Sequence, residues 1–225
     1  MKNILITGAN RGLGLEFAKQ YSKNGYKLYT TARNTELCDN LKKIPNNDIF
    51  NLNLLSQNSI ESFIKNIKDK EIDLLINNAG IFHDEQFKED LQSDVWAKEI
   101  LINAISPIIL TQKLKQNLLH GDDKKIVFIS SQMGSIDDNY LGKYYFYRSS
   151  KAALNASARS LSIDWKNDGL AVLMLHPGWV KTDMGGEEAN LNIDASVSHM
   201  INVINDFSIN ETGSFLNYAG KKLEW

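Results

Sequence analysis

Short runs of apolar residues alternate with longer amphipathic segments along the whole chain. Most of the short runs are apolar at nearly every position, which is typical of parallel strands covered on both faces. A strand with one face in water would alternate apolar and polar residues instead. The seven expected strands span residues 3–7, 26–32, 49–54, 72–77, 125–130, 170–176 and 213–218.

Between these runs, apolar side chains recur with helical spacing. Residues at i, i+3, i+4 and i+7 share one face of a helix. Two sets show this pattern: Ile60, Phe63, Ile64 and Ile67, and Val197, Met200, Ile201 and Ile204. Ser56 and Ser93 are expected N-caps, because a serine hydroxyl accepts a hydrogen bond from the first helical turn.

The regular alternation of strands and helices predicts the fold class. Parallel strands joined by right-handed helical crossovers give an α/β, Rossmann-type, doubly wound sheet with helices on both faces. Ligands of such sheets bind outside the carboxyl ends of the strands. The residues that end each strand are therefore the candidates for chemistry.

Composition limits the classes of function. The chain has 225 residues, 43% hydrophobic and 23% charged, and we expect one domain over 1–225. A net charge of −2 argues against a nucleic-acid or membrane partner. The single cysteine, Cys38, allows no internal disulfide and fits a cytoplasmic protein. No apolar run is long enough for a signal peptide or a membrane span.

The first expected strand is followed by TGANRGLG, residues 7–14, and then by a helical pattern. Gly8, Gly12 and Gly14 let the backbone turn sharply and approach a pyrophosphate, whose charge a helix N-terminus favours. Glycines also serve ordinary turns, but the strand–loop–helix context favours dinucleotide binding.

The second expected strand ends in Thr31, Ala32 and Arg33. An NAD-binding site usually carries an acidic residue here for the ribose 2′-hydroxyl, whereas a 2′-phosphate requires a cation. Arg33, with Arg11 in the glycine loop, favours NADP(H) over NAD(H). The alternative is that both arginines are merely solvated surface residues.

Further polar residues stand at or near the later strand ends. NNAG (77–80) ends the fourth strand, and Asn103 is expected inside a long helix downstream. Ser130 and Ser131 end the fifth strand. Tyr147 and Lys151 are four residues apart, so they share a helix face. This spacing alone fits either an aromatic helix start in the core or a tyrosine whose proton is controlled by a lysine.

The six motifs TGANRGLG, NNAG, NAISP, ISS, YRSSK and HPGWVKTDM, in this order, resemble the short-chain dehydrogenase/reductase family over essentially the whole chain. The ending GSFLNYAGKKLEW is similar to its C-factor and sniffer-type carbonyl reductase branch. The resemblance implies about seven strands in the order 3-2-1-4-5-6-7. It also implies a catalytic tetrad of Asn103, Ser131, Tyr147 and Lys151. Ser131 is chosen over Ser130 because the family serine is usually the second of such a pair.

The resemblance further implies an NADPH-dependent oxidoreductase that reduces a small apolar or aromatic carbonyl compound, with Tyr147 as general acid/base, and no metal ion. Lys151 is expected to lower the pKa of Tyr147 and to hold the nicotinamide ribose. The expected cofactor-binding residues are Gly8, Asn10, Arg11, Gly12, Leu13, Gly14, Arg33, Asn53, Leu54, Asn78, Ala79, Gly80, Tyr147, Lys151, Pro177, Gly178, Val180 and Thr182. Asn53 stands where family members commonly carry aspartate.

The expected wall of the substrate pocket is mostly aromatic and apolar, and comprises Phe82, His83, Met133, Tyr140, Tyr144, Trp179 and Met184. The alternative function is an NADP(H)-binding regulatory or signalling protein of C-factor type, which would not need the tetrad. An extended epimerase is disfavoured by the length of the chain and the glycine spacing. By resemblance, the helices that carry Asn103 and Tyr147 form a homodimer interface, or part of a tetramer.

Overall fold

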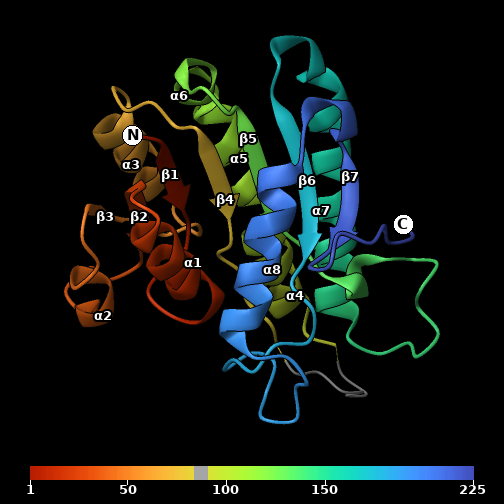
Figure 1. Ribbon diagram of the computed structural model, residues 1–225. Coiled ribbons are helices and arrows are strands. Elements are labelled where there is room, and N and C mark those ends of the chain that lie inside the picture. The colour runs from red at the N-terminus through yellow and green to blue at the C-terminus, as the bar shows by residue number, and fades with distance from the viewer. Residues whose placement is uncertain (84–90) are drawn as a thin grey trace.

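The computed structural model describes residues 1–83 and 91–225. Seven strands form one sheet in the order β3-β2-β1-β4-β5-β6-β7, and all neighbouring pairs are parallel. Both the expected fold class and the expected strand order are confirmed (Figure 1). The strands are β1 Asn3–Ile6, β2 Lys27–Ala32, β3 Asn47–Asn51, β4 Leu74–Asn77, β5 Lys125–Ile129, β6 Ala171–His176 and β7 Ser214–Asn217.

Helices cover both faces of the sheet (Figure 1). Successive strand residues point to opposite faces, so Ile4 and Ile6 pack with one layer and Leu5 with the other. The first layer contains α1 Gly12–Lys23, α2 Asp39–Lys42 and α8 Ile193–Asp206. The second contains α3 Gln57–Ile67, α5 Ser106–Lys113, α6 Lys115–His120 and α7 Tyr145–Asp164. This two-sided burial explains why the strands are apolar throughout.

The helical stripes lie where their spacing predicts. In α3, Ile60, Phe63 and Ile67 are buried and Ile64 is partly buried, while all four stripe residues of α8 are buried. Ser56 caps α3, because its hydroxyl accepts a hydrogen bond from the Ser59 N–H at 3.2 Å. The expected cap at Ser93 is wrong: Gln92 is the N-cap of α4 (Ser93–Ile100), and Ser93 is the first helical residue.

The sequence predicted that Asn103 lies inside one long regular helix, but the helix is not regular at this residue. Between α4 and α5 the chain forms a π-helical segment, η1, at Leu101–Ile105, and the Ser106 N–H donates to the Leu101 carbonyl. Pro107 follows in the first turn of α5, where a missing N–H is tolerated. Single π-helical turns widen a helix locally and often occur at functional sites.

Strands β1, β4, β5 and β6 are adjacent and parallel, so their carboxyl ends open onto the same edge. The segments that follow them carry the glycine loop, NNAG, the serine pair and HPGWV. Within residues 1–83 and 91–225, no helix combines the length and the apolar character needed to cross a membrane.

Candidate active site

The loop after β1 is fastened to the end of β4 by Thr7 and Asn78. The Thr7 hydroxyl accepts hydrogen bonds from the N–H groups of Asn78 (3.0 Å) and Ala79 (3.1 Å). The Asn78 side-chain amide donates to the carbonyls of Thr7 and Gly8. Asn78 therefore shapes the glycine loop, and its amide is engaged in protein contacts.

Two glycines show why this loop suits a pyrophosphate. A Cβ at Gly14 would lie 2.5 Å from the Gly8 carbonyl oxygen, so α1 starts against the loop with no room for a side chain. Gly12 has a φ of +54°, and a Cβ there would meet only Thr182, at 3.9 Å. The N-cap of α1, Arg11, provides no side-chain cap bond. The first N–H groups of α1 thus receive no cap bond from the Arg11 side chain, and this fits a phosphate ligand.

The two arginines of the predicted 2′-phosphate site differ. Arg33 is exposed directly after β2, and its carbonyl accepts a hydrogen bond from the Asn51 side chain at 2.7 Å. Arg11 forms an ion pair with Asp183, with 2.6 Å between Nη1 and Oδ2. Asp183 was not among the sequence candidates. Within residues 1–83 and 91–225 Arg33 therefore forms no ion pair, whereas Arg11 already has an anionic partner.

After β3, Asn53 and Leu54 make internal contacts. The Asn53 side-chain oxygen accepts a hydrogen bond from the Leu55 N–H at 3.1 Å. The Leu54 side chain is buried, and its carbonyl accepts from the Ser106 hydroxyl at 2.6 Å. Asn53 thus shapes the turn that leads into α3, and Leu54 connects the segment after β3 to the start of α5.

Asn103 holds the segment that follows NNAG. Its side-chain oxygen accepts from the Ile81 N–H and its amide donates to the Ile81 carbonyl, both at 2.8 Å. The same amide also donates to the Ser150 hydroxyl on α7, at 3.0 Å. A Cβ at Gly80 would lie 3.2 Å from Asn103 Oδ1 and 3.8 Å from Lys151 Nζ. Asn103 and Lys151 are therefore brought together around Gly80.

The serine pair after β5 separates into two roles. Ser131 is hydrogen-bonded to the Tyr147 side chain, and its oxygen accepts from the Met133 N–H at 3.1 Å. Ser130 is buried and donates to the Asn155 side chain at 2.6 Å. The geometry thus brings Ser131, as expected, to the candidate acid and places Ser130 in a structural contact.

Tyr147 and Lys151 lie together on α7, with the Lys151 ammonium 5.6 Å from the centre of the Tyr147 ring. Lys151 is buried, and it donates to the Ile129 carbonyl at 2.9 Å. Burial lowers the pKa of Lys151 to about 8, and the negative charge of Glu99 opposes this.

The pKa of Tyr147 is raised by burial, which outweighs the hydrogen bond from Ser131, and Glu99 raises it further. The expectation that Lys151 brings the pKa of Tyr147 down is therefore wrong for these residues as they stand. The reason is that desolvation of the phenolate dominates. Tyr147 is a protonated phenol, the form that donates a proton.

The wall predicted around Tyr147 is only partly assembled. The Phe82 ring meets Tyr147 edge-on at 5.1 Å and Tyr144 at 5.8 Å. Tyr144 itself has a left-handed backbone conformation, φ +53°, at the N-cap of α7. Met133 is half-buried in η2 (Gln132–Gly134) beside Ser131. Tyr140 is 85% exposed, so it is not part of a buried wall.

The segment after β6 folds back on itself. Val180 pairs with Leu191, and the Thr182 hydroxyl accepts from the Gly185 N–H at 3.0 Å. This leaves two predicted wall residues half-exposed on the loop: Trp179, whose indole donates to the Gly185 carbonyl, and Met184. The remaining predicted cofactor residues of this segment are Pro177, whose carbonyl accepts from Ser196, and Gly178, with φ +85°.

The sequence missed a buried carboxylate next to the tetrad. Glu99 is fully buried, and its Oε2 lies 2.7 Å from Nδ1 of His83, a predicted wall residue. Glu99 interacts electrostatically with both Tyr147 and Lys151. No local signal marks it in the sequence, because Glu99 follows Lys98 and the pair looks like an ordinary charged stretch of a helix.

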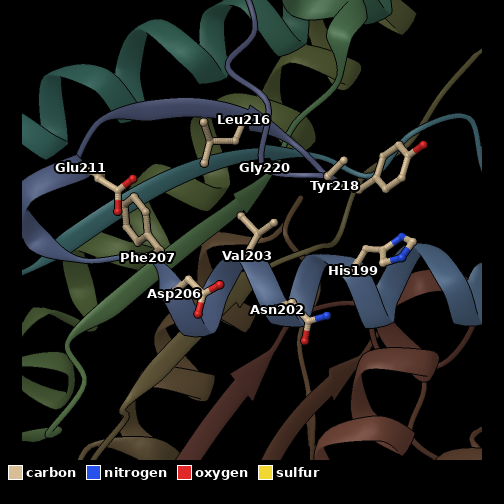
Figure 2. A pocket seen from close by; sticks show the side chains of 10 residues that line it. His199, Asn202, Val203, Asp206, Phe207, Glu211, Leu216, Tyr218 and Gly220 are labelled. Atoms are coloured by element: carbon tan, nitrogen blue, oxygen red, sulfur yellow. The ribbon is translucent and has the colours of Figure 1, made fainter.

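A groove outside this site lies between α8 and β7 (Figure 2). It measures about 460 Å³ and contains no tetrad residue. His199 stacks on Tyr218 at its rim, with 5.8 Å between the ring centres.

Residues 2–192 match the family model described as short chain dehydrogenase. The chain is 37% identical to the C-signal of Myxococcus xanthus over 74% of this chain and all of that protein. Its fold matches carbonyl reductase Sniffer of D. melanogaster, with 32% identity, full coverage of both chains and a TM-score of 0.93. It also matches an NADPH-bound carbonyl reductase from chicken fatty liver, with 33% identity, coverage of 100% of this chain and 99% of that chain, and a TM-score of 0.91.

Proposed function

The chain belongs to the short-chain dehydrogenase family, and from this membership we propose that it is an NADPH-dependent reductase of small apolar or aromatic carbonyl compounds. The observation that carries the proposal is the convergence of Ser131, Tyr147 and Lys151 at one edge of the sheet, with Asn103 fixing the adjacent segment. The carbonyl reductases with the same fold support it.

The glycine loop and the residues facing it would hold NADPH. The glycine turn at Gly12 and the start of α1 suit the pyrophosphate. Arg33 would bind the 2′-phosphate, and Arg11 would join it on leaving Asp183. Lys151 would hold the nicotinamide ribose, and Thr182 the carboxamide.

When bound, the cofactor supplies the hydride for the carbonyl carbon. Tyr147 donates its phenolic proton to the carbonyl oxygen, and burial keeps that proton in place because it raises the pKa of the phenol. Ser131 stands next to this hydroxyl, so its O–H can donate to the oxygen as negative charge develops there. Phe82, packed edge-on against Tyr147, gives the site an apolar side that favours an apolar or aromatic carbonyl substrate.

The test is to follow NADPH oxidation by the purified protein with a panel of aldehydes, ketones and quinones. We expect turnover of some members with NADPH and less with NADH. No turnover of any class, despite NADPH binding, would favour the alternative of an NADP(H)-binding signalling protein. That alternative has the similarity to C-signal in its favour, but it gives no role to the Ser131–Tyr147–Lys151 arrangement.

We also propose that the chain is cytoplasmic and forms a homodimer. Ile105 and Ile109 are 46% and 40% exposed and lie four residues apart along η1 and α5. A second copy of the chain covering this face would form the expected homodimer. Light scattering coupled to gel filtration measures its mass directly, and a monomer would contradict the proposal.

A further inference from the structure

Glu99 lies between two points where the α4–η1 run is fastened to α7. At one point the Trp96 ring stacks on Phe146 at 5.3 Å, and its indole N–H donates to Ser149 at 2.7 Å. At the other, Asn103 donates to Ser150. Glu99 is three residues after Trp96 and four before Asn103, so it shares their helix face. Its carboxylate is thereby held toward the part of α7 that carries Tyr147 and Lys151.

The burial of this carboxylate requires a physical reason. Glu99 is 0% exposed, and ionised carboxylates are rarely buried without a partner. One oxygen, Oε2, is 2.7 Å from Nδ1 of His83. Burial raises the pKa of Glu99 and the contact with His83 opposes this rise; the ionised carboxylate only accepts, so the imidazole N–H donates to it. The other oxygen, Oε1, has no hydrogen-bond partner among residues 1–83 and 91–225. A hydrogen bond from His83 alone therefore leaves Glu99 incompletely satisfied.

The charged groups around Glu99 identify what its charge acts on. His83 interacts with it from the segment after β4, and Lys151 and Tyr147 interact with it from α7. Lys151 is the buried cation of this set, and its ammonium donates a hydrogen bond to the neutral Ile129 carbonyl. A buried ammonium in a neutral environment loses its proton readily, and a nearby anion opposes that loss.

We propose that Glu99, held by His83, is the buried counter-charge that keeps Lys151 protonated, and that it acts on proton transfer through Lys151 without touching the reacting atoms. Glu99 is thus a positioning residue. The purely structural alternative is that the His83–Glu99 contact only ties the segment after β4 to α4. The effect on turnover rests on the proposed reductase function, whereas the charge state of Lys151 does not.

The direct test is an NMR titration of the Lys151 side-chain nitrogen in ¹⁵N-lysine-labelled protein, with the signal assigned by its absence in Lys151→Met. Removing the negative charge with Glu99→Gln should lower the titration midpoint by roughly one pH unit. The matched control is Asp94→Asn, which removes an exposed carboxylate from the same helix and should leave the midpoint unchanged. An unchanged midpoint in a folded Glu99→Gln protein would overturn the proposal.

A second substitution and a second measurement complete the design. If Glu99→Gln does not fold, Glu99→Met keeps the side-chain length without a polar group, and the same downward shift is expected. In an active protein, the alkaline limb of the pH–rate profile should move to lower pH with the NMR midpoint, because Glu99 also raises the pKa of Tyr147. A shifted midpoint in a protein that reduces no carbonyl would contradict the proposed reductase function but support the role of Glu99.

Discussion

Arg11 and Asp183 form an ion pair of 2.6 Å that joins the glycine loop after β1 to the segment after β6. The two side chains are 65% and 77% exposed. Exposed ion pairs are weak, because water competes and the side chains lose freedom. A phosphate that offers Arg11 several charged acceptors can therefore displace Asp183. Arg11 can therefore bind NADPH once its contact with Asp183 is broken.

We expect Asp183→Asn to tighten NADPH binding, because Arg11 then has no carboxylate to leave. Exposed pairs contribute roughly 0.2–1 kcal/mol, so the gain should be at most about five-fold in Kd. Binding of NADH, which lacks the 2′-phosphate, should not change. Fluorescence titration with both cofactors measures this. Equal tightening for NADH would show that Asp183 acts on the cleft in general and not through Arg11.

Arg33→Ala should weaken NADPH binding and leave NADH binding near that of the wild type. A hydrogen bond to a charged group contributes about 1.5–3 kcal/mol, which corresponds to roughly 10- to 150-fold in Kd. Lys43→Ala, which removes another exposed cation between β2 and β3, is the matched control and should have little effect. An equal loss for both cofactors would contradict the 2′-phosphate role of Arg33.

Tyr147→Phe should leave NADPH binding intact and lower the rate of carbonyl reduction by about 10²–10⁴-fold, the usual contribution of a general acid. The ring contact with Phe82 survives in the variant, so folding should be unaffected. Tyr145→Phe is the control, since Tyr145 is 44% exposed at the start of the same helix. Steady-state rates decide between them: inactivity of Tyr145→Phe with an active Tyr147→Phe would refute the assignment.

The strands and the helical stripes were predictable because burial leaves a local mark. Ile4, Leu5 and Ile6 are buried on alternate faces of a covered sheet, so their strand is apolar at every position. The Tyr147–Lys151 spacing was less informative. A helix face alone does not separate a packed tyrosine from a catalytic one, and the choice depended on the family resemblance.

The contacts that modify the site could not be predicted, because they join distant segments. Asp183 lies 172 residues from Arg11 along the chain, and nothing local to either residue indicates the pairing. Glu99 looks like an ordinary helix residue until α7 is packed against α4. The π-helical turn at Leu101–Ile105 was likewise unpredictable, because its mostly apolar sequence also suits a regular α-helix.

Lys151 should lower the stability of the protein at neutral pH while it supports catalysis. Its pKa falls from 10.5 to about 8 on folding, because burial disfavours the ammonium. The cost is fully present below about pH 8 and disappears as the pH rises toward 10.5, where the lysine is neutral in both the folded and unfolded chains. One pKa unit corresponds to about 1.4 kcal/mol, so the cost is at most a few kcal/mol, partly offset by the bond to Ile129.

We therefore expect Lys151→Met to have a Tm a few degrees above that of the wild type near pH 7. This difference should shrink toward pH 10. Differential scanning calorimetry across this range measures it. Lys166→Met, in the exposed η3 turn (Lys166–Asp168), is the control and should show no such trend. A difference that stays constant with pH would mean that the charge of Lys151 does not lower the stability of the folded protein. A difference that grows toward pH 10 would reverse the sign of the argument, since burial would then favour the ammonium.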